Sequence, residues 1–149
     1  MARVLIIAYG NPMRCDDGLG LRAAEELSRL GMLPDIEITT CYQLAPELAE
    51  EVSQASLVVF VDAARSGVPG QIVTACVRPC QQRSVFTHDF SPASILGLAQ
   101  ELYGKCPEAH VVSVCGECFD HGEAISVKVM ESLPSLIAVV EKLIARTPP

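Results

Sequence analysis

Two carboxylates and one imidazole stand where strands of this sequence are expected to end. Asp17 follows the N-terminal apolar run, Asp62 follows the apolar run 56–61, and His88 precedes a predicted helix on the same side of the sheet. Because ligands bind beyond the carboxyl ends of strands in open α/β sheets, we expect these groups to converge. Two oxygen ligands and one nitrogen ligand suit a divalent transition metal, and they also suit general acid–base catalysis.

Each of these residues also has a purely structural interpretation. An Asp at a strand end commonly caps a helix or stabilises a turn, and a His in a loop commonly makes surface hydrogen bonds. Asp16 is open to both interpretations, because an acid near a helix N-terminus is stabilising without any function. We interpret Asp16 as a turn or capping residue, so that Asp16→Asn is expected to be mild. The combination of Asp17, Asp62 and His88 supports a site more than any single member does.

The segment 10–20, GNPMRCDDGLG, contains three glycines directly after the first apolar run. Their spacing does not give the dinucleotide-binding fingerprint, and no Lys-Ser or Lys-Thr pair completes a phosphate-binding loop. We therefore do not expect nucleotide binding, and the glycines predict a tight turn.

The seven cysteines are scattered through a chain large enough to fold without disulfides, which favours reduced thiols. Cys115 and Cys118 form a CxxC motif, but it lacks the second pair of a zinc site and follows the last predicted strand. Structural cysteines are the preferred interpretation, and a small redox or zinc protein is the alternative. Cys15 lies between Arg14, which favours a thiolate, and Asp16, which disfavours one, so its role stays open.

Length and composition predict a single cytoplasmic domain. The chain has 149 residues, half of them apolar, which is enough to build one core over residues 1–149. Its formal net charge is −7 and its Lys and Arg residues form no cluster, so nucleic acid is not an expected partner. The apolar runs are far shorter than the roughly 20 residues that span a bilayer. The N-terminal run is also too short for a signal peptide, so we expect a cytoplasmic monomer without membrane insertion.

Strands and helices are expected to alternate along the chain. Short runs rich in Val, Ile and Leu predict strands over 3–9, 36–40, 56–61, 71–77 and 110–114. Apolar spacing and capping residues predict helices over 21–30, 46–52 and 91–103, the last with Ser91 as N-cap and Pro92 at its first position. A C-terminal helix contains residues 136–144, with a possible earlier start at Ser126 and a break at Pro134. This order predicts a three-layer α/β/α sandwich with a mostly parallel central sheet, of the phosphorylase/hydrolase-like kind.

Four segments, in this order, resemble the hydrogenase maturation endopeptidases. They are GNPMRCDDGLG at 10–20, VFVDA at 59–63, THDFSP at 87–92, and the segment 116–127 with its Phe, Gly and Ser residues. The resemblance implies that Asp17, Asp62 and His88 gather around a metal position. It also implies an endopeptidase that removes the C-terminal extension of a nickel-loaded hydrogenase large-subunit precursor. The nickel would belong to the substrate, and no tightly bound resident cofactor is expected.

Two mechanisms and one competing function remain open at this stage. The substrate's metal could activate the attacking water, or Asp17 and Asp62 could share the catalysis directly, one of them as base and the other as acid. A non-enzymatic maturation chaperone that binds the nickel site would need the same three residues. The sequence departs from the family pattern at Cys15 and Cys118, which leaves those three residues intact.

Overall fold

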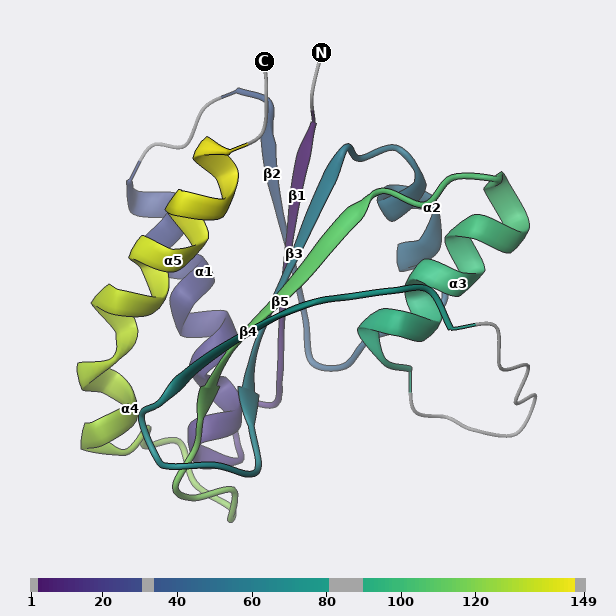
Figure 1. The fold of residues 1–149 in the computed structure, drawn as a ribbon. Coiled ribbons are helices and arrows are strands. Elements are labelled where there is room, and N and C mark those ends of the chain that lie inside the picture. The colour runs from purple at the N-terminus through teal and green to yellow at the C-terminus, as the bar shows by residue number, and fades with distance from the viewer. Residues whose placement is uncertain (1–2, 31–33, 81–89, 147–149) are drawn as a thin grey trace.

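The computed structural model describes residues 3–30, 34–80 and 90–146 of the chain. These residues form one five-stranded sheet in the order β2-β1-β3-β5-β4 (Figure 1). The strands are β1 (Val4–Tyr9), β2 (Ile36–Cys41), β3 (Leu57–Ala64), β4 (Ile72–Cys76) and β5 (Glu108–Cys115). The first four in spatial order run parallel and β4 pairs antiparallel with β5, which confirms the mostly parallel sheet.

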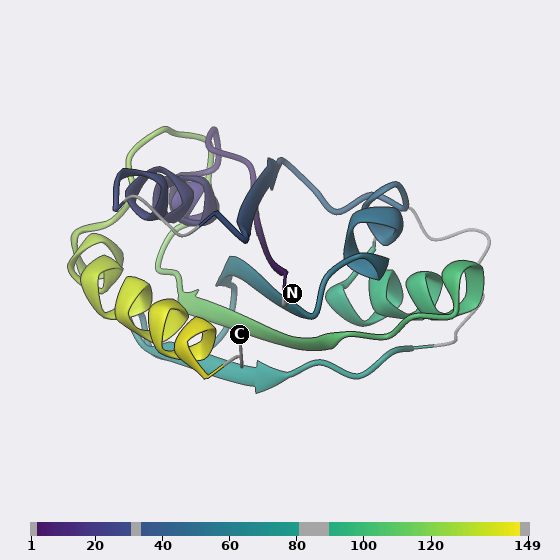
Figure 2. The same cartoon turned by 90° about the horizontal axis from the view of Figure 1, so that it is seen from above.

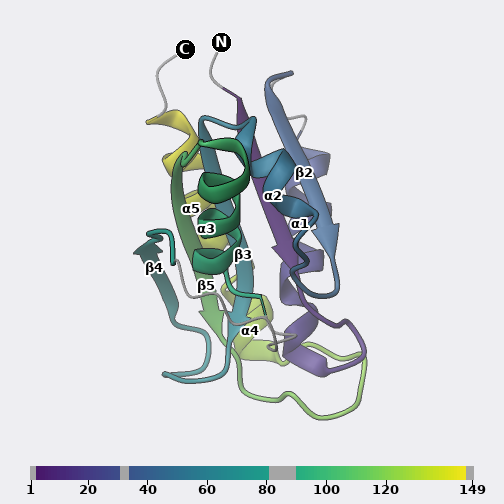
Figure 3. The same ribbon diagram turned by 90° about the vertical axis from the view of Figure 1, so that its right-hand side faces the viewer.

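Helices cover both faces of this sheet. They are α1 (Leu19–Arg29), α2 (Leu48–Ser53), α3 (Pro92–Tyr103), α4 (Val127–Glu131) and α5 (Leu133–Ala145), with a short 3₁₀ helix, η1 (Cys15–Gly18), before α1. Viewed from above, α1 and α5 lie on one side and α2 and α3 on the other (Figure 2). Figure 3 shows α2 and α3 in front of the strands. The predicted three-layer α/β/α sandwich is therefore confirmed.

The central strands bury side chains on both faces, as parallel strands between two helical layers must. In β1, Val4 and Ile6 pack into the core under α1 and α5, and Leu5 and Ile7 pack into the core under α2 and α3. This alternation explains why the N-terminal apolar run is continuous in sequence. Among the described residues, no helix is long and apolar enough to cross a membrane.

Local signals locate most helix boundaries. Ser91 and Ser94 form a reciprocal capping box at the start of α3, with Pro92 in its first turn, as predicted. The predicted break near the C-terminus is also present: Ser126 precedes α4, and α5 begins after Ser132 with Pro134 in its first turn.

One expected boundary was wrong. Asp62 was expected just beyond its strand, but β3 continues to Ala64. Strand β3 extends this far because it stays paired with β5, where Asp62 lies opposite Ser113 and Ala64 lies opposite Cys115. Asp62 is therefore held by strand pairing and not by a loop.

Helix α1 lies directly against the backbone of the two central strands at their carboxyl ends. A Cβ atom on Gly20 would lie 2.6 Å from the Tyr9 carbonyl oxygen and 2.8 Å from the Val61 carbonyl oxygen. Such distances are shorter than side chains tolerate, so the absence of a side chain at Gly20 lets the helix approach. This contact fixes η1 and α1 relative to β1 and β3.

We predict that Gly20→Ala lowers the free energy of unfolding by about 1–3 kcal/mol, because the methyl group must push α1 away from two carbonyl groups. Gly→Ala within a helix is ordinarily stabilising by roughly 0.5–1 kcal/mol, so the sign of the change is diagnostic. Urea denaturation provides the measurement, with Ser28→Ala on the exposed part of the same helix as the control. A stabilised Gly20→Ala protein would contradict the close approach.

Candidate active site

The strand order places a topological switch point between β1 and β3. From β1 the chain continues to β2 on one side, whereas β3 lies on the other side of β1. At such a reversal the connections leave in opposite directions, so the carboxyl ends of the two strands are left accessible to ligands. The carboxyl ends of β1 and β3 lie at the lower edge of the sheet in Figure 1. Asp17 follows β1, and Asp62 lies near the end of β3.

Asp17 is fixed by the turn that follows β1. Its carboxylate accepts a hydrogen bond from the backbone N–H of Asn11 at 2.7 Å. Gly10 makes the turn possible with a φ of 144°, and a Cβ there would lie 1.9 Å from the Asp17 carbonyl oxygen. The side chain of Asp17 therefore stabilises the turn, and no side chain in the described part of the chain caps the start of α1.

Asp62 is held by hydroxyl groups from the strands on both sides. The Tyr9 hydroxyl on β1 donates to one carboxylate oxygen at 2.8 Å, and the Ser113 hydroxyl on β5 donates to the other at 2.6 Å. Three adjacent strands thus contribute to one polar cluster, and two donors fix the orientation of the carboxylate.

Electrostatics couple Asp62 to Asp17. Burial raises the pKa of Asp62, and the negative charge of Asp17 adds to the increase, while the Ser113 and Tyr9 hydroxyls oppose it. The net pKa lies above the ordinary value for an aspartate. Burial, followed by the charge of Asp62, likewise raises the pKa of Tyr9, so Tyr9 stays a hydrogen-bond donor. The structure therefore brings the two predicted carboxylates into one electrostatic environment.

Asp16 has a different role from the one expected. It is fully buried, and its carboxylate accepts hydrogen bonds from the backbone N–H groups of Glu117 (2.7 Å), Cys118 (2.9 Å) and Ser126 (2.7 Å) and from the Ser126 hydroxyl (2.9 Å). Burial acts to raise the pKa of Asp16, but these donors outweigh it and hold the pKa below its usual value. The interpretation of Asp16 as a turn or capping residue was therefore wrong, because its donors come from a distant segment.

The segment that Asp16 holds contains Phe119. The guanidinium of Arg65 lies 4.7 Å from the centre of the Phe119 ring, and the Arg14 Nε donates to the Phe119 carbonyl oxygen at 3.2 Å. A cation over an aromatic ring is attracted by its electron-rich face. Phe119 is thereby fixed between two basic residues next to η1.

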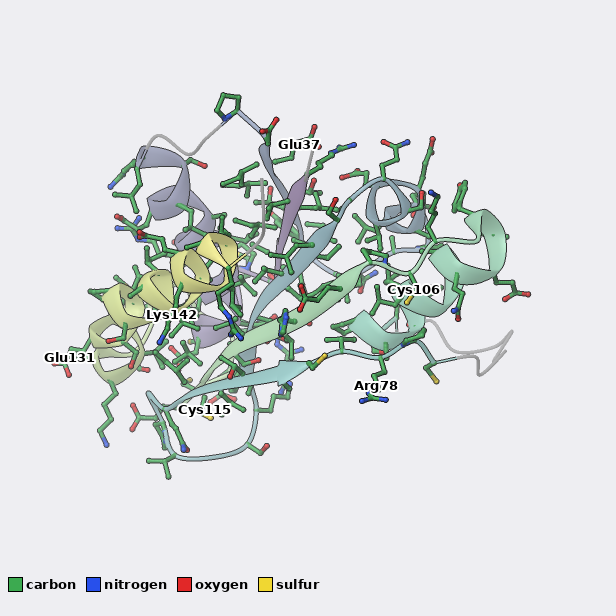
Figure 4. All side chains as sticks on the ribbon, turned by 45° about the horizontal axis from the view of Figure 1, so that its top comes forward. Glu37, Arg78, Cys106, Cys115, Glu131 and Lys142 are labelled. Carbon is green, nitrogen blue, oxygen red and sulfur yellow. The ribbon has the colours of Figure 1, made fainter. Side chains whose placement is uncertain are left out.

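The two cysteines of the CxxC motif have different surroundings. Cys115, labelled in Figure 4, is buried at the end of β5, where a Cβ on Gly67 would lie 2.6 Å from its sulfur. Cys118 is partly exposed, and its thiol donates to the Asp120 carboxylate at 3.9 Å. The interaction with the Cys118 side chain, followed by burial and nearby negative charges, raises the pKa of Cys15. The described residues contain no group of three or more His, Cys, Asp or Glu side chains that could hold a metal ion.

The third expected ligand, His88, lies outside the described residues. Sequence reasoning did not single out Tyr9 and Ser113 as partners of Asp62. Both lie near the ends of predicted strands, and this position together with their polarity was the signal that could have identified them.

Comparison with known proteins gives matches at the level of structure. Neither a family model nor a curated protein matches the sequence. The hydrogenase maturating endopeptidase HybD from E. coli superimposes with a TM-score of 0.80 at 22% identity, over 96% of this chain and 92% of that one. The [NiFe] hydrogenase maturation protease HycI from Thermococcus kodakarensis KOD1 superimposes with a TM-score of 0.78 at 24% identity, over 97% of this chain and 94% of that one. The [NiFe] hydrogenase maturation protease HybD from Thermococcus kodakarensis superimposes with a TM-score of 0.73 at 25% identity, over 95% of this chain and 98% of that one.

The fold and the site together define an α/β/α protein with paired carboxylates at the switch point of its sheet. The particular fold is that of the hydrogenase maturation endopeptidases, over nearly the whole chain. The likeness to that family that the sequence predicts is confirmed by these structural matches.

We predict that Asp16→Asn lowers the free energy of unfolding by about 2–3 kcal/mol, because an amide cannot accept all four hydrogen bonds and leaves buried donors unpaired. Urea denaturation followed by circular dichroism measures the change. Asp120→Asn, the same chemical change at an exposed position of the same segment, should alter stability by less than about 0.5 kcal/mol. Equal stability of the two variants would show that Asp16 does not hold the segment.

Proposed function

We propose that this protein is an endopeptidase that removes the C-terminal extension of a nickel-loaded hydrogenase large-subunit precursor. The observation that carries the proposal is the position of Asp17 and Asp62 at the switch point of a fold shared with named hydrogenase maturation proteases. All three of the structures compared above are named as proteases or endopeptidases, so a non-enzymatic chaperone gains no support.

The electrostatics of the carboxylate pair favour a cationic substrate. Burial and, to a smaller extent, the charge of Asp17 raise the pKa of Asp62, against the opposing effect of the Ser113 and Tyr9 hydroxyls, so its ionisation costs more than that of a free aspartate. A divalent cation between the two carboxylates would offset both effects, because opposite charges favour the ionised form. The nickel of the precursor provides such a charge, and His88 would supply a nitrogen ligand, so the metal is the feature by which the precursor is recognised.

The same arrangement suits peptide hydrolysis. A divalent metal polarises the scissile carbonyl and lowers the pKa of an attacking water. Asp17 is fixed by the Asn11 N–H, and Asp62 by the Tyr9 and Ser113 hydroxyls, so neither carboxylate has to reorganise when the substrate arrives. Each carboxylate keeps further lone pairs for contact with the metal or the water.

We predict that Asp17→Asn, Asp62→Asn and His88→Ala each slow cleavage of a nickel-loaded precursor by at least about 100-fold, the lower end of the usual contribution of an acid–base or ligand group. The mass of the precursor before and after incubation reports cleavage, and circular dichroism reports folding. Asp120→Asn should cleave at the wild-type rate. A folded variant of Asp17, Asp62 or His88 that retains full activity would remove that residue from the site.

We also predict that cleavage requires nickel in the folded precursor. Without the cation, an incoming chain would have to cover two carboxylates at a cost in desolvation that no other contact offsets. Matched nickel-loaded and nickel-free precursors, and an isolated peptide that spans the cut, are incubated with the protein and followed by mass. The nickel-free precursor and the peptide should stay intact. Equal cleavage of both precursors would instead support direct catalysis, with Asp62 as the acid and Asp17 as the base.

A further inference from the structure

Two cysteines that are about one hundred residues apart in sequence lie side by side next to Asp17. Cys15 is the first residue of η1, and its side chain interacts with that of Cys118, whose thiol also donates to the Asp120 carboxylate at 3.9 Å. The backbones on either side are also joined: the Cys15 N–H donates to the Gly122 carbonyl at 2.7 Å, and the Asp16 N–H donates to the Cys118 carbonyl at 3.0 Å.

The backbone spacing suits a disulfide. Arg14 and Gly122 form a parallel β-bridge, so the two segments run side by side as neighbouring strands do, about 5 Å apart. Disulfides form where the Cα atoms lie roughly 4.4–6.8 Å apart. Cys118 is held close to Cys15 by the hydrogen bond from the N–H of Asp16, the next residue after Cys15, to the Cys118 carbonyl oxygen.

The local conformation directs the Cys15 thiol to this position. Cys15 has a φ of 50°, in the left-handed region that residues other than glycine rarely adopt. Gly122 leaves room for the thiol, because a Cβ there would lie 3.0 Å from the Cys15 sulfur. Cys15 keeps this unfavourable conformation because its N–H and that of Asp16 are both bonded to the neighbouring segment.

Accessibility separates this pair from the CxxC motif. Cys15 and Cys118 are both partly exposed, so a small oxidant can reach them, whereas Cys115 is buried against Gly67. Cys118 therefore has Cys15 as its partner, although Cys115 is closer in sequence.

We propose that Cys15 and Cys118 are a redox-modification site that closes a reversible disulfide between η1 and the segment 116–122. The oxidant is a small disulfide such as oxidised glutathione. One cysteine thiolate attacks it to form a mixed disulfide and releases one glutathione thiolate. The second cysteine thiolate then attacks the protein sulfur of the mixed disulfide and releases the other. The pair loses two electrons, the oxidant gains them, and the two protons of the cysteines go to the released glutathione.

The disulfide would act on the site through Asp17, and this part of the inference rests on the proposed function. Forming the bond draws the two sulfur atoms to covalent distance. Cys15 is two residues from Asp17 in the same short helix, so η1 absorbs part of the movement. Because a misplacement of about 1 Å can cost a factor of 100 in rate, the oxidised protein is expected to cleave the precursor at least tenfold more slowly.

The test is a map of the thiols after oxidation. The full-length protein is incubated with oxidised glutathione and a chelator at about pH 8.5, near the ordinary pKa of a thiol, and remaining thiols are blocked with N-ethylmaleimide. Digestion without reductant uses trypsin and a glutamate-specific protease, because Glu117 lies between Cys115 and Cys118. We expect a crosslink between peptides 15–22 and 118–123 that dithiothreitol removes. Three results would each overturn the proposal: N-ethylmaleimide-blocked thiols at both Cys15 and Cys118, lasting glutathione adducts there, or a disulfide between Cys115 and Cys118.

Matched variants test the assignment and the coupling. Cys15→Ser and Cys118→Ser should each lose the crosslink, and Cys106→Ser, at the exposed position labelled in Figure 4, should keep it. In the cleavage assay, the oxidised wild-type protein should regain its cleavage rate when dithiothreitol is added. The cleavage rate of Cys15→Ser should change with neither oxidised glutathione nor dithiothreitol. A crosslink that leaves the rate unchanged would overturn the coupling to Asp17. An inactive reduced protein would count against the proposed function alone, because the crosslink is detected without activity.

Discussion

The buried carboxylate of Asp16 is the interaction on which the geometry of the site depends. It accepts four hydrogen bonds from a segment that begins after β5 and ends at the start of α4. An ionised group away from water is tolerated only when such donors replace its hydration. Since Asp16 immediately precedes Asp17, the contacts that stabilise its charge also determine where Asp17 lies. A fully buried residue thereby positions the neighbouring carboxylate of the candidate site.

The central strands provide the second constraint. Asp62 is paired within the ladder of β3 and β5, and its carboxylate is oriented by hydroxyls on β1 and β5, so it moves only if the sheet moves. Asp17, in contrast, is held by a turn and a short 3₁₀ helix. The candidate site therefore joins a carboxylate held within the sheet to one held by a turn that is anchored through Asp16. Such a pair suits a cation bound between two carboxylates from different elements.

Sequence reasoning identified the layers, nearly all strands and helices, and the pair Asp17 and Asp62, because apolar periodicity and the position of strand ends are local properties. It did not identify the role of Asp16, whose four donors lie more than one hundred residues away. It could not assign the partner of Cys118 either, because that pairing depends on how η1 lies against segment 116–122. The Tyr9 and Ser113 hydroxyls were not predicted as partners of Asp62 for the same reason. They reach Asp62 because β1 and β5 flank β3, and the order of strands in a sheet is not a local property of the sequence.

The long sequence separation of the Asp16 contacts also has a consequence for the time at which the site forms. A chain synthesised from its N-terminus exposes Asp16 and Asp17 early, but the donors at Glu117, Cys118 and Ser126 emerge last. Contacts between distant parts of a chain form late, since the entropy of closing the loop is lost before the contacts compensate for it. Nascent or truncated chains that lack these donors can build the first strands while η1 stays unanchored. The carboxylate pair is then assembled in the last step of folding, so a protein of this kind gains its site only when its chain is nearly complete.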